Sequence, residues 1–171
     1  MKRERAHLVL ADGTCFEGVA IGAPITSVGE AVFTTGMTGY QEVLTDPSFA
    51  GQIVCMTAPQ MGNTGTTGED EEAERPALAG FAVHELSPIA SNWRSTRTLD
   101  AYLADHGIAA IAGIDTRALT RHVRDHGAQM AALGTESVHA LLEKAKGAPP
   151  MAGQDLTGGV TTKEAFEWSE G

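Results

Sequence analysis

The sequence predicts a mixed α/β domain in which helices cover one face of a sheet, and two observations lead to this prediction. Up to about residue 57, β-branched and aromatic runs are separated by glycine turns, which is typical of hairpins. From residue 77 onward, short apolar runs alternate with stretches of helical periodicity. This order of strand, helix, strand and helix favours parallel pairing through right-handed crossovers.

The first half of the chain is predicted to consist mainly of strands. Residues 7–10 and 15–20 flank the pair Asp12-Gly13, which is a strong signal for a hairpin turn. Further strands are predicted at residues 28–35 and 52–57.

Between these strands, residues 36–48 predict a glycine-hinged turn followed by a short helix. Gly36 and Gly39 free the backbone to turn sharply. Thr38 followed three residues later by Gln41 has the form of a capping box, which predicts that the helix begins at Gly39. Its apolar face would comprise Tyr40, Val43 and Leu44.

The predicted helix ends at a proline. The ring of Pro47 disfavours helical geometry at Asp46, which should stop the helix there. A helix of about eight residues is marginal alone, so tertiary packing has to hold it in place. This reasoning places Ser48 at a rigid corner, where the hydroxyl is either a simple turn residue or a ligand for a bound molecule.

The second half predicts strands at 79–84, 108–111 and 128–133, and helices at 98–106, 116–126 and 137–146. Thr98 and Asp115 are placed as N-caps of the first two helices. Prolines end the last helix, so we predict a domain at residues 1–150 and a connector at residues 151–171. Phe166 and Trp168 are apolar anchors without an evident partner, which indicates that the natural chain continues.

Charge and hydropathy exclude several classes of partner. The formal net charge is −10, which argues against binding to nucleic acid or to an anionic membrane surface. The apolar runs are too short to span a membrane, and the N-terminus lacks the apolar core of a signal peptide. We therefore predict a cytoplasmic protein.

Residues 62–74 are predicted to form a surface loop. The glycines in this stretch are not followed by Lys-Ser/Thr, so a phosphate-binding P-loop is not expected. The acidic run at residues 69–74 lacks the alternating ligands of a calcium loop, so we interpret it as a solvated charge run. Its role stays open.

Neither cysteine is predicted to be a nucleophile. Cys15 and Cys55 do not lie in a nucleophile-elbow motif and do not have metal-site spacing. Cys55 lies in an apolar strand, where a buried, inert thiol is expected. A disulfide between the two is disfavoured in the cytoplasm.

Two other pairs of polar residues could be mistaken for sites. His122 and His126 have the i, i+4 spacing of a zinc pair, but Val123 stands where a glutamate would be expected, so an exposed helix face is favoured and no metal site is predicted. Glu42 and Asp46 could form an acid/base pair, but a solvated edge of a short helix is favoured.

Several motifs carry a family resemblance in chain order. They are residues 11–14 (ADGT), 36–54 (GMTGYQEVLTDPSFAGQIV), 89–94 (IASNWR), 114–121 (IDTRALTR) and 160–162 (VTT). Together they resemble the N-terminal domain of the small, glutamine-using subunit of carbamoyl phosphate synthetase. The resemblance implies a three-layer β/β/α swivelling domain with mixed sheets.

The resemblance also implies partners and a reaction. A C-terminal class I amidotransferase domain would carry a Cys–His–Glu triad that hydrolyses L-glutamine. That domain is not found in these 171 residues, so this fragment should be inactive alone. The large subunit would use the ammonia with bicarbonate and ATP to make carbamoyl phosphate for arginine and pyrimidine biosynthesis. ATP and Mg would bind to the large subunit, and no cofactor is expected in this chain.

The resemblance assigns one substrate contact to this chain and no catalytic residue. Ser48 would contact bound glutamine at the boundary with the amidotransferase domain. The supporting motif consists of Gly36, Thr38, Gly39, Gln41, Asp46 and Pro47. The alternative is a non-enzymatic α/β module that uses the same corner to bind an anion or a peptide.

Overall fold

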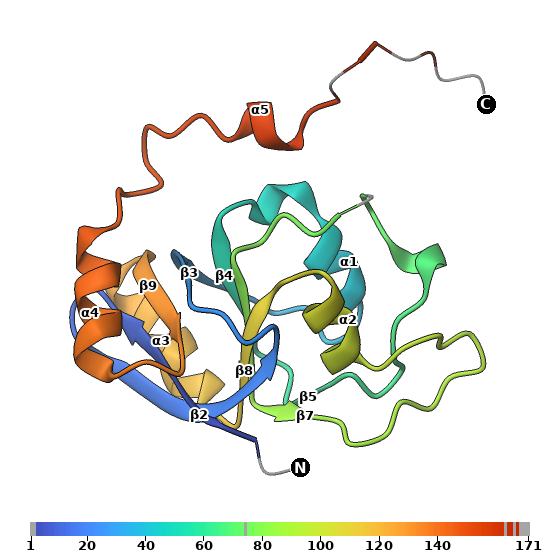
Figure 1. The fold of residues 1–171 in the computed structure, drawn as a ribbon, viewed down its shortest axis with the longest axis horizontal. Helices are drawn as coiled ribbons and strands as arrows, with labels where there is room; N and C mark the ends of the chain where they lie inside the picture. Colours follow the sequence, from blue (N-terminus) through green and yellow to red (C-terminus); the bar gives the residue numbers. More distant parts are fainter. Residues whose placement is uncertain (1–2, 74, 163, 166, 168–171) are drawn as a thin grey trace.

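The computed structural model describes residues 3–73, 75–162, 164–165 and 167, and its centre is a closed barrel (Figure 1). The strand order around the barrel is β1-β2-β8-β6-β4-β3-β9. The strands β3, β4, β6 and β8 pair in parallel, and the remaining pairs are antiparallel. The barrel strands are β1 Arg5–Leu10, β2 Cys15–Gly22, β3 Ser27–Thr34, β4 Gln52–Met56, β6 Gly80–Val83, β8 Ala109–Ala112 and β9 Gln129–Gly134.

The remaining elements lie outside the barrel. A small parallel sheet pairs β5 Gln60–Met61 with β7 Glu85–Leu86. The helices are α1 Tyr40–Thr45, α2 Leu99–Asp105, α3 Thr116–His126, α4 Val138–Gly147 and α5 Thr157–Val160, with short 3-10 turns η1 Pro47–Phe49 and η2 Gly68–Asp70. Among the described residues, none of these helices has the length and apolar character needed to cross a membrane.

The predicted hairpin and the predicted N-caps are confirmed. β1 and β2 pair antiparallel around the turn at Asp12-Gly13. The side chain of Thr98 accepts a hydrogen bond from the backbone N–H of Ala101, and that of Asp115 accepts one from Ala118. These caps satisfy backbone donors that have no partner within the helix, so local sequence sets where α2 and α3 begin.

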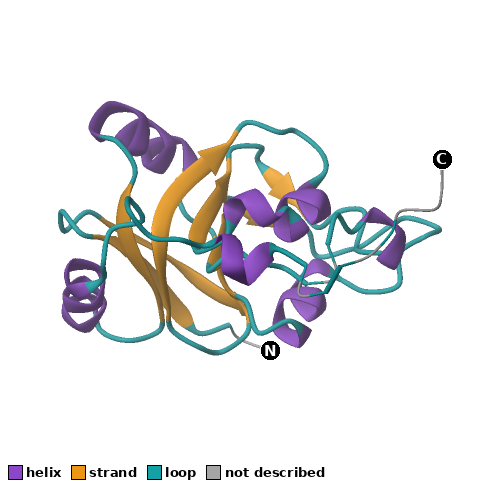
Figure 2. Ribbon diagram, turned by 90° about the horizontal axis from the view of Figure 1, so that it is seen from above, coloured by secondary structure: helices purple, strands orange, loops and turns teal. Residues whose placement is uncertain are grey.

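The mixed α/β class is confirmed, but the prediction that helices cover one face holds for α1, α2 and α4 and fails for α3, which packs against the inward-facing cluster. Strand residues alternate between two apolar faces: Ile53 and Cys55 of β4 point into the barrel cluster, whereas Val54 points outward with Met56. Because both faces are apolar, both must be covered. The helices α1 and α2 pack on the outer face of β4, β6 and β8, and Leu141 of α4 packs on the outer face of β1 and β9. Figure 2 shows helices on both sides of the strands.

The expected parallel crossover through α3 is also wrong. β6 and β8 pair in parallel across α2, as predicted, but β9 pairs antiparallel with β1 and β3. The chain after α3 therefore returns to the far side of the sheet and closes the barrel. Leu119 and Val123 of α3 join the inward-facing cluster, so this helix packs onto the barrel interior.

The β1–β2 turn is fixed to α3 and β9 through Asp12. Its carboxylate accepts hydrogen bonds from the backbone N–H of Thr14 at 2.8 Å and the side chain of Gln129 at 3.0 Å, and it contacts His122 Nε2 at 2.6 Å. Burial opposes ionisation, but the hydrogen bonds from Thr14, Gln129 and His122 together hold the pKa of Asp12 below its ordinary value of 3.8. His122 is therefore a partner of the turn and not a freely exposed side chain.

Neutralising Asp12 should lower stability in a pH-dependent way. A carboxylate whose pKa is lower in the folded state stabilises the protein at pH values above its unfolded-state pKa. This stabilisation is lost as the pH falls through the folded-state pKa. We expect Asp12→Asn to reduce the free energy of unfolding by about 1 kcal/mol at neutral pH, a modest figure because the carboxylate is partly exposed. Urea unfolding of wild type and variant at pH 7, 4 and 3 measures this change in the free energy of unfolding.

The exposed Glu143 on α4 provides the control for this experiment. Glu143→Gln should leave the free energy of unfolding nearly unchanged at each pH. The difference between wild type and Asp12→Asn should shrink below pH 4. A difference that stays constant down to pH 3 would contradict the role assigned to the carboxylate.

Candidate functional site

The corner between α1 and β4, residues 39–51, contains Ser48, and we call it the Ser48 corner. The helix α1 begins at Tyr40, one residue later than predicted. Gly39 is its N-cap, with a backbone in the left-handed region at φ 75° and ψ 34°, and no side chain caps the helix. The capping-box prediction from Thr38 and Gln41 is therefore wrong. Because Gly39 occupies the cap position, Thr38 lies one residue too early to cap the helix, and the amide of Gln41 has other partners.

Gln41 clamps the corner to a distant loop. Its side chain, in a residue that is 4% exposed, donates to the carbonyl of Thr67 and accepts from the backbone N–H of Thr67 at 2.9 Å. This pairing satisfies both backbone groups of a buried residue, as a strand neighbour would. Residues 65–67 are buried, so the prediction of a surface loop is wrong for them.

Two further side chains of α1 hold the same loop. The hydroxyl of Tyr40 contacts that of Thr64 at 2.9 Å and donates to the carbonyl of Gly65. The hydroxyl of Thr45 donates to the carbonyl of Gln41 at 3.1 Å and accepts from the backbone N–H of Glu72 at 2.9 Å. The helix, which is only six residues long, is thus held by contacts along its whole length.

The acidic run is bound to the domain, so the prediction of a purely solvated charge run is wrong for the residues described. Arg94 donates to Glu69 at 3.2 Å and to both carboxylate oxygens of Asp70, at 2.9 and 3.2 Å. The carboxylate of Glu71 accepts from the hydroxyl of Tyr102 at 3.2 Å. Residues 69–72 therefore form a brace behind α1, and residue 74 lies outside the described part of the chain.

The end of α1 has the predicted geometry. Asp46 is extended, with φ −67° and ψ 115°, and its carboxylate accepts from the backbone N–H of Ser48 at 2.8 Å. This bond caps the 3-10 turn that Pro47 begins, which gives Asp46 a structural role instead of the acid/base role considered above. Ser48 is exposed, so its hydroxyl is presented outward from a turn that is fixed from behind.

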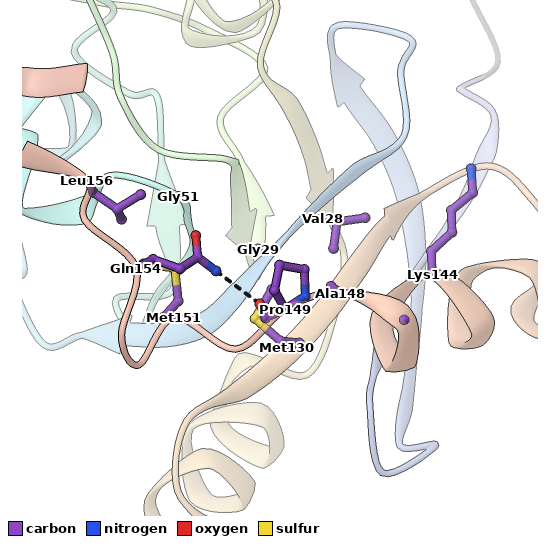
Figure 3. A pocket seen from close by; sticks show the side chains of 11 residues that line it. Val28, Gly29, Gly51, Met130, Lys144, Ala148, Pro149, Met151, Gln154 and Leu156 are labelled. Carbon is purple, nitrogen blue, oxygen red and sulfur yellow. Dashed lines mark hydrogen bonds between the residues drawn. The ribbon is translucent and has the colours of Figure 1, made fainter. Parts of the chain in front are cut away.

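The residues that follow α4, predicted above to be a connector, lie beside Gly51 of this corner (Figure 3). The backbone of Gly51 has φ +71°, and a Cβ added to it would lie 3.4 Å from the sulfur of Met151 and 3.6 Å from Leu156. Gln154 donates to the carbonyls of Pro149 and Pro150, at 3.1 and 2.8 Å, and so folds the connector back on itself. Gly51, Met151 and Leu156 line one pocket, so the chain beyond residue 150 passes close to the segment that carries Ser48. The predicted anchors Phe166 and Trp168 lie outside the described residues.

Neither thiol has the surroundings of a nucleophile. Burial raises the pKa of the Cys55 thiol to about 12, and burial together with the charge of Glu17 raises that of Cys15. Both cysteines are free, so the disulfide is absent between them, and an elevated pKa keeps each as the unreactive thiol.

The histidine pair has no metal-site geometry. The rings of His122 and His126 stack with centroids 4.4 Å apart, and His126 Nδ1 bonds the carbonyl of His122. Within the described ranges, no group of three or more His, Cys, Asp or Glu residues is placed to hold a metal ion.

Comparison with known proteins identifies the family. Residues 8–133 match the family model described as "Carbamoyl-phosphate synthase small chain, CPSase domain". A carbamoyl phosphate synthase small chain from Thermosynechococcus vestitus is 54% identical over 167 residues, 96% of this chain and 44% of that protein. The chain belongs to the carbamoyl-phosphate synthase small chain family. Small chains from Syntrophotalea carbinolica and Pseudomonas putida are 53% and 52% identical, over 98% and 95% of this chain.

The comparison with these small chains covers only part of their length. The chain spans 44% to 45% of the three relatives. The family match at residues 8–133 includes most of the barrel, the Ser48 corner and the brace, whereas residues 151–171 lie beyond it.

Sequence reasoning missed the contacts that fix the corner. The partners of Tyr40, Gln41 and Thr45 lie between 24 and 27 residues further along the chain. One signal was present: Gln41 and Thr45 are polar residues at i, i+4 on a helix too short to stand alone, which is typical of side chains that bond another segment. The identity of that segment is not encoded locally.

Removing the Gln41 amide should destabilise the domain. In Gln41→Ala, the buried N–H and C=O of Thr67 both lose their partner, which should cost about 2–3 kcal/mol in the free energy of unfolding. Urea denaturation at pH 7 measures this. The matched control is Gln60→Ala, which removes an exposed amide that bonds Glu85 and should cost less than about 0.5 kcal/mol. Equal losses in the two variants would contradict the clamp.

Proposed function

We propose that this chain is the N-terminal domain of the small, glutaminase subunit of carbamoyl phosphate synthetase, and that its Ser48 corner forms one wall of the glutamine site. The single observation that carries this assignment is an exposed serine on a turn that is braced from behind. The other wall would come from a C-terminal class I amidotransferase domain. That domain, and not this one, would supply the Cys–His–Glu triad.

The path of the connector supports this arrangement. Met151 and Leu156 lie close to Gly51, three residues after Ser48, so the segment that would lead to the next domain passes near the corner. The relatives are more than twice as long as this chain, which leaves room for such a domain. The division into a domain at 1–150 and a connector at 151–171 is part of this proposal.

Ser48 would orient glutamine without taking part in covalent chemistry. A hydroxyl can both donate and accept a hydrogen bond, which suits the ammonium and carboxylate groups of an amino acid. Because Asp46 and the loop clamp fix the turn, the hydroxyl is pre-positioned and loses little freedom when substrate binds.

The remaining parts of the proposal come from the family. The domain would adopt the three-layer β/β/α swivelling arrangement and would hold the small subunit against the large subunit. The large subunit would bind ATP and Mg and would combine ammonia with bicarbonate to form carbamoyl phosphate for arginine and pyrimidine biosynthesis. A non-enzymatic anion- or peptide-binding module has less support, because α1 is too short to offer a strong helix terminus.

The test is Ser48→Ala in the full-length small chain, assembled with its large subunit. The KM for glutamine should rise about tenfold through loss of a hydrogen bond to a charged group, whereas carbamoyl phosphate synthesis from added ammonia should be unchanged. Steady-state kinetics with both nitrogen donors measure this. Ser48→Thr keeps the hydroxyl and should recover part of the affinity. Unchanged glutamine kinetics in Ser48→Ala would remove Ser48 from the site and favour a binding module.

A further inference from the structure

A second concave surface lies at the opposite edge of the sheet from the Ser48 corner. The parallel strands β3, β4, β6 and β8 all end at this edge, where Thr57 follows β4 and His84 follows β6. The helix α3 begins after β8 and forms one wall of the resulting groove. Ser48 precedes β4 and so lies at the other end of that strand. In α/β barrels, as in open α/β sheets, ligands bind outside the carboxyl ends of parallel strands, which makes this end of the barrel a natural place for a site.

Arginine side chains line this groove. Arg117, Arg121 and Arg124 all contribute to its lining and have the spacing i, i+4 and i+7 on α3, so they follow one stripe of the helix. This concentration of positive charge stands out in a chain whose formal net charge is −10.

Two of the arginines have no carboxylate partner. Arg124 pairs with Asp125 at 2.9 Å, but neither Arg117 nor Arg121 forms an ion pair with any residue that the structure describes. Asp115 is the acidic residue in the groove lining, and its carboxylate accepts the N-cap bond from Ala118 at 2.8 Å. The guanidinium groups of Arg117 and Arg121 are therefore available to an outside ligand.

The imidazole ring of His84 lies on the opposite wall of the groove and is held in one orientation by a hydrogen bond. His84 Nδ1 lies 2.9 Å from the carbonyl of Ile114. Since a carbonyl can only accept, Nδ1 carries the proton in this bond, and the ring is held at the end of β6 with Nε2 unused by that contact.

We propose that this groove binds an oxyanion, the carboxylate or phosphate group of a small molecule, with Arg117 and Arg121 as its principal ligands. Planar guanidinium groups pair with two oxygens of a carboxylate or phosphate at once, so a pair of unpartnered arginines in a concave site selects this chemistry. The site is distinct from the Ser48 corner and does not depend on the function proposed for it.

The experiment is a titration of the 171-residue chain with inorganic phosphate and, separately, with acetate, at constant ionic strength. Two-dimensional ¹H–¹⁵N NMR follows backbone amides. We expect saturable shifts at Thr57, His84 and the first two turns of α3. The double variant Arg117→Gln/Arg121→Gln should weaken binding at least about tenfold, because it removes two charge-assisted contacts.

The matched control is Arg5→Gln/Arg97→Gln, which removes the same charge from exposed positions outside the groove. It should leave the dissociation constant unchanged, and thermal unfolding should show that both double variants remain folded. Equal weakening in the two double variants, or no saturable binding of either anion, would overturn the proposal. Binding of a hexaglutamate peptide but of neither small anion would also overturn it, and would assign the arginine stripe to an acidic protein segment.

Discussion

The pairing between the Gln41 side chain and the backbone of Thr67 is the constraint on which the corner depends. A helix of six residues has too few internal hydrogen bonds to be stable alone. The amide of Gln41 replaces the missing backbone partners of a buried loop, while that loop in turn holds the helix. The position of Ser48 is therefore a property of the folded domain and not of the local sequence.

The brace at residues 69–72 also holds α1 in place, through contacts closer to the protein surface. Arg94 holds Glu69 and Asp70, and Thr45 bonds the backbone of Glu72, so an acidic stretch that would repel itself in isolation is tied to the domain at several points. Such contacts order the loop already in the folded protein. Substrate binding then does not have to supply the conformational entropy of ordering it. The same contacts leave the outward face of η1 open.

Sequence reasoning succeeded where the signal was local. Asp115 as the N-cap of α3, the turn at Asp12-Gly13 and the extended geometry of Asp46 before a proline all follow from neighbouring residues, and all are observed. It failed where partners are distant. His122 bonds Asp12 across 110 residues, and β9 joins β1 and β3 because the sheet closes into a barrel, which no short window of sequence encodes. The capping box failed because the left-handed Gly39 took the position assigned to Thr38.

The two surfaces considered for binding lie at opposite ends of β4, one on a clamped turn and one at the strand termini. The first is assigned to glutamine because the family resemblance points to Ser48 and because this serine is exposed on a turn that is held from behind. A crystal structure of the full-length small chain with bound L-glutamine tests this assignment most directly. We expect a polar atom of Ser48 within about 2.7–3.2 Å of the ligand, with Gln41 still paired to Thr67. Glutamine bound with no polar atom of Ser48 inside about 4 Å would contradict it.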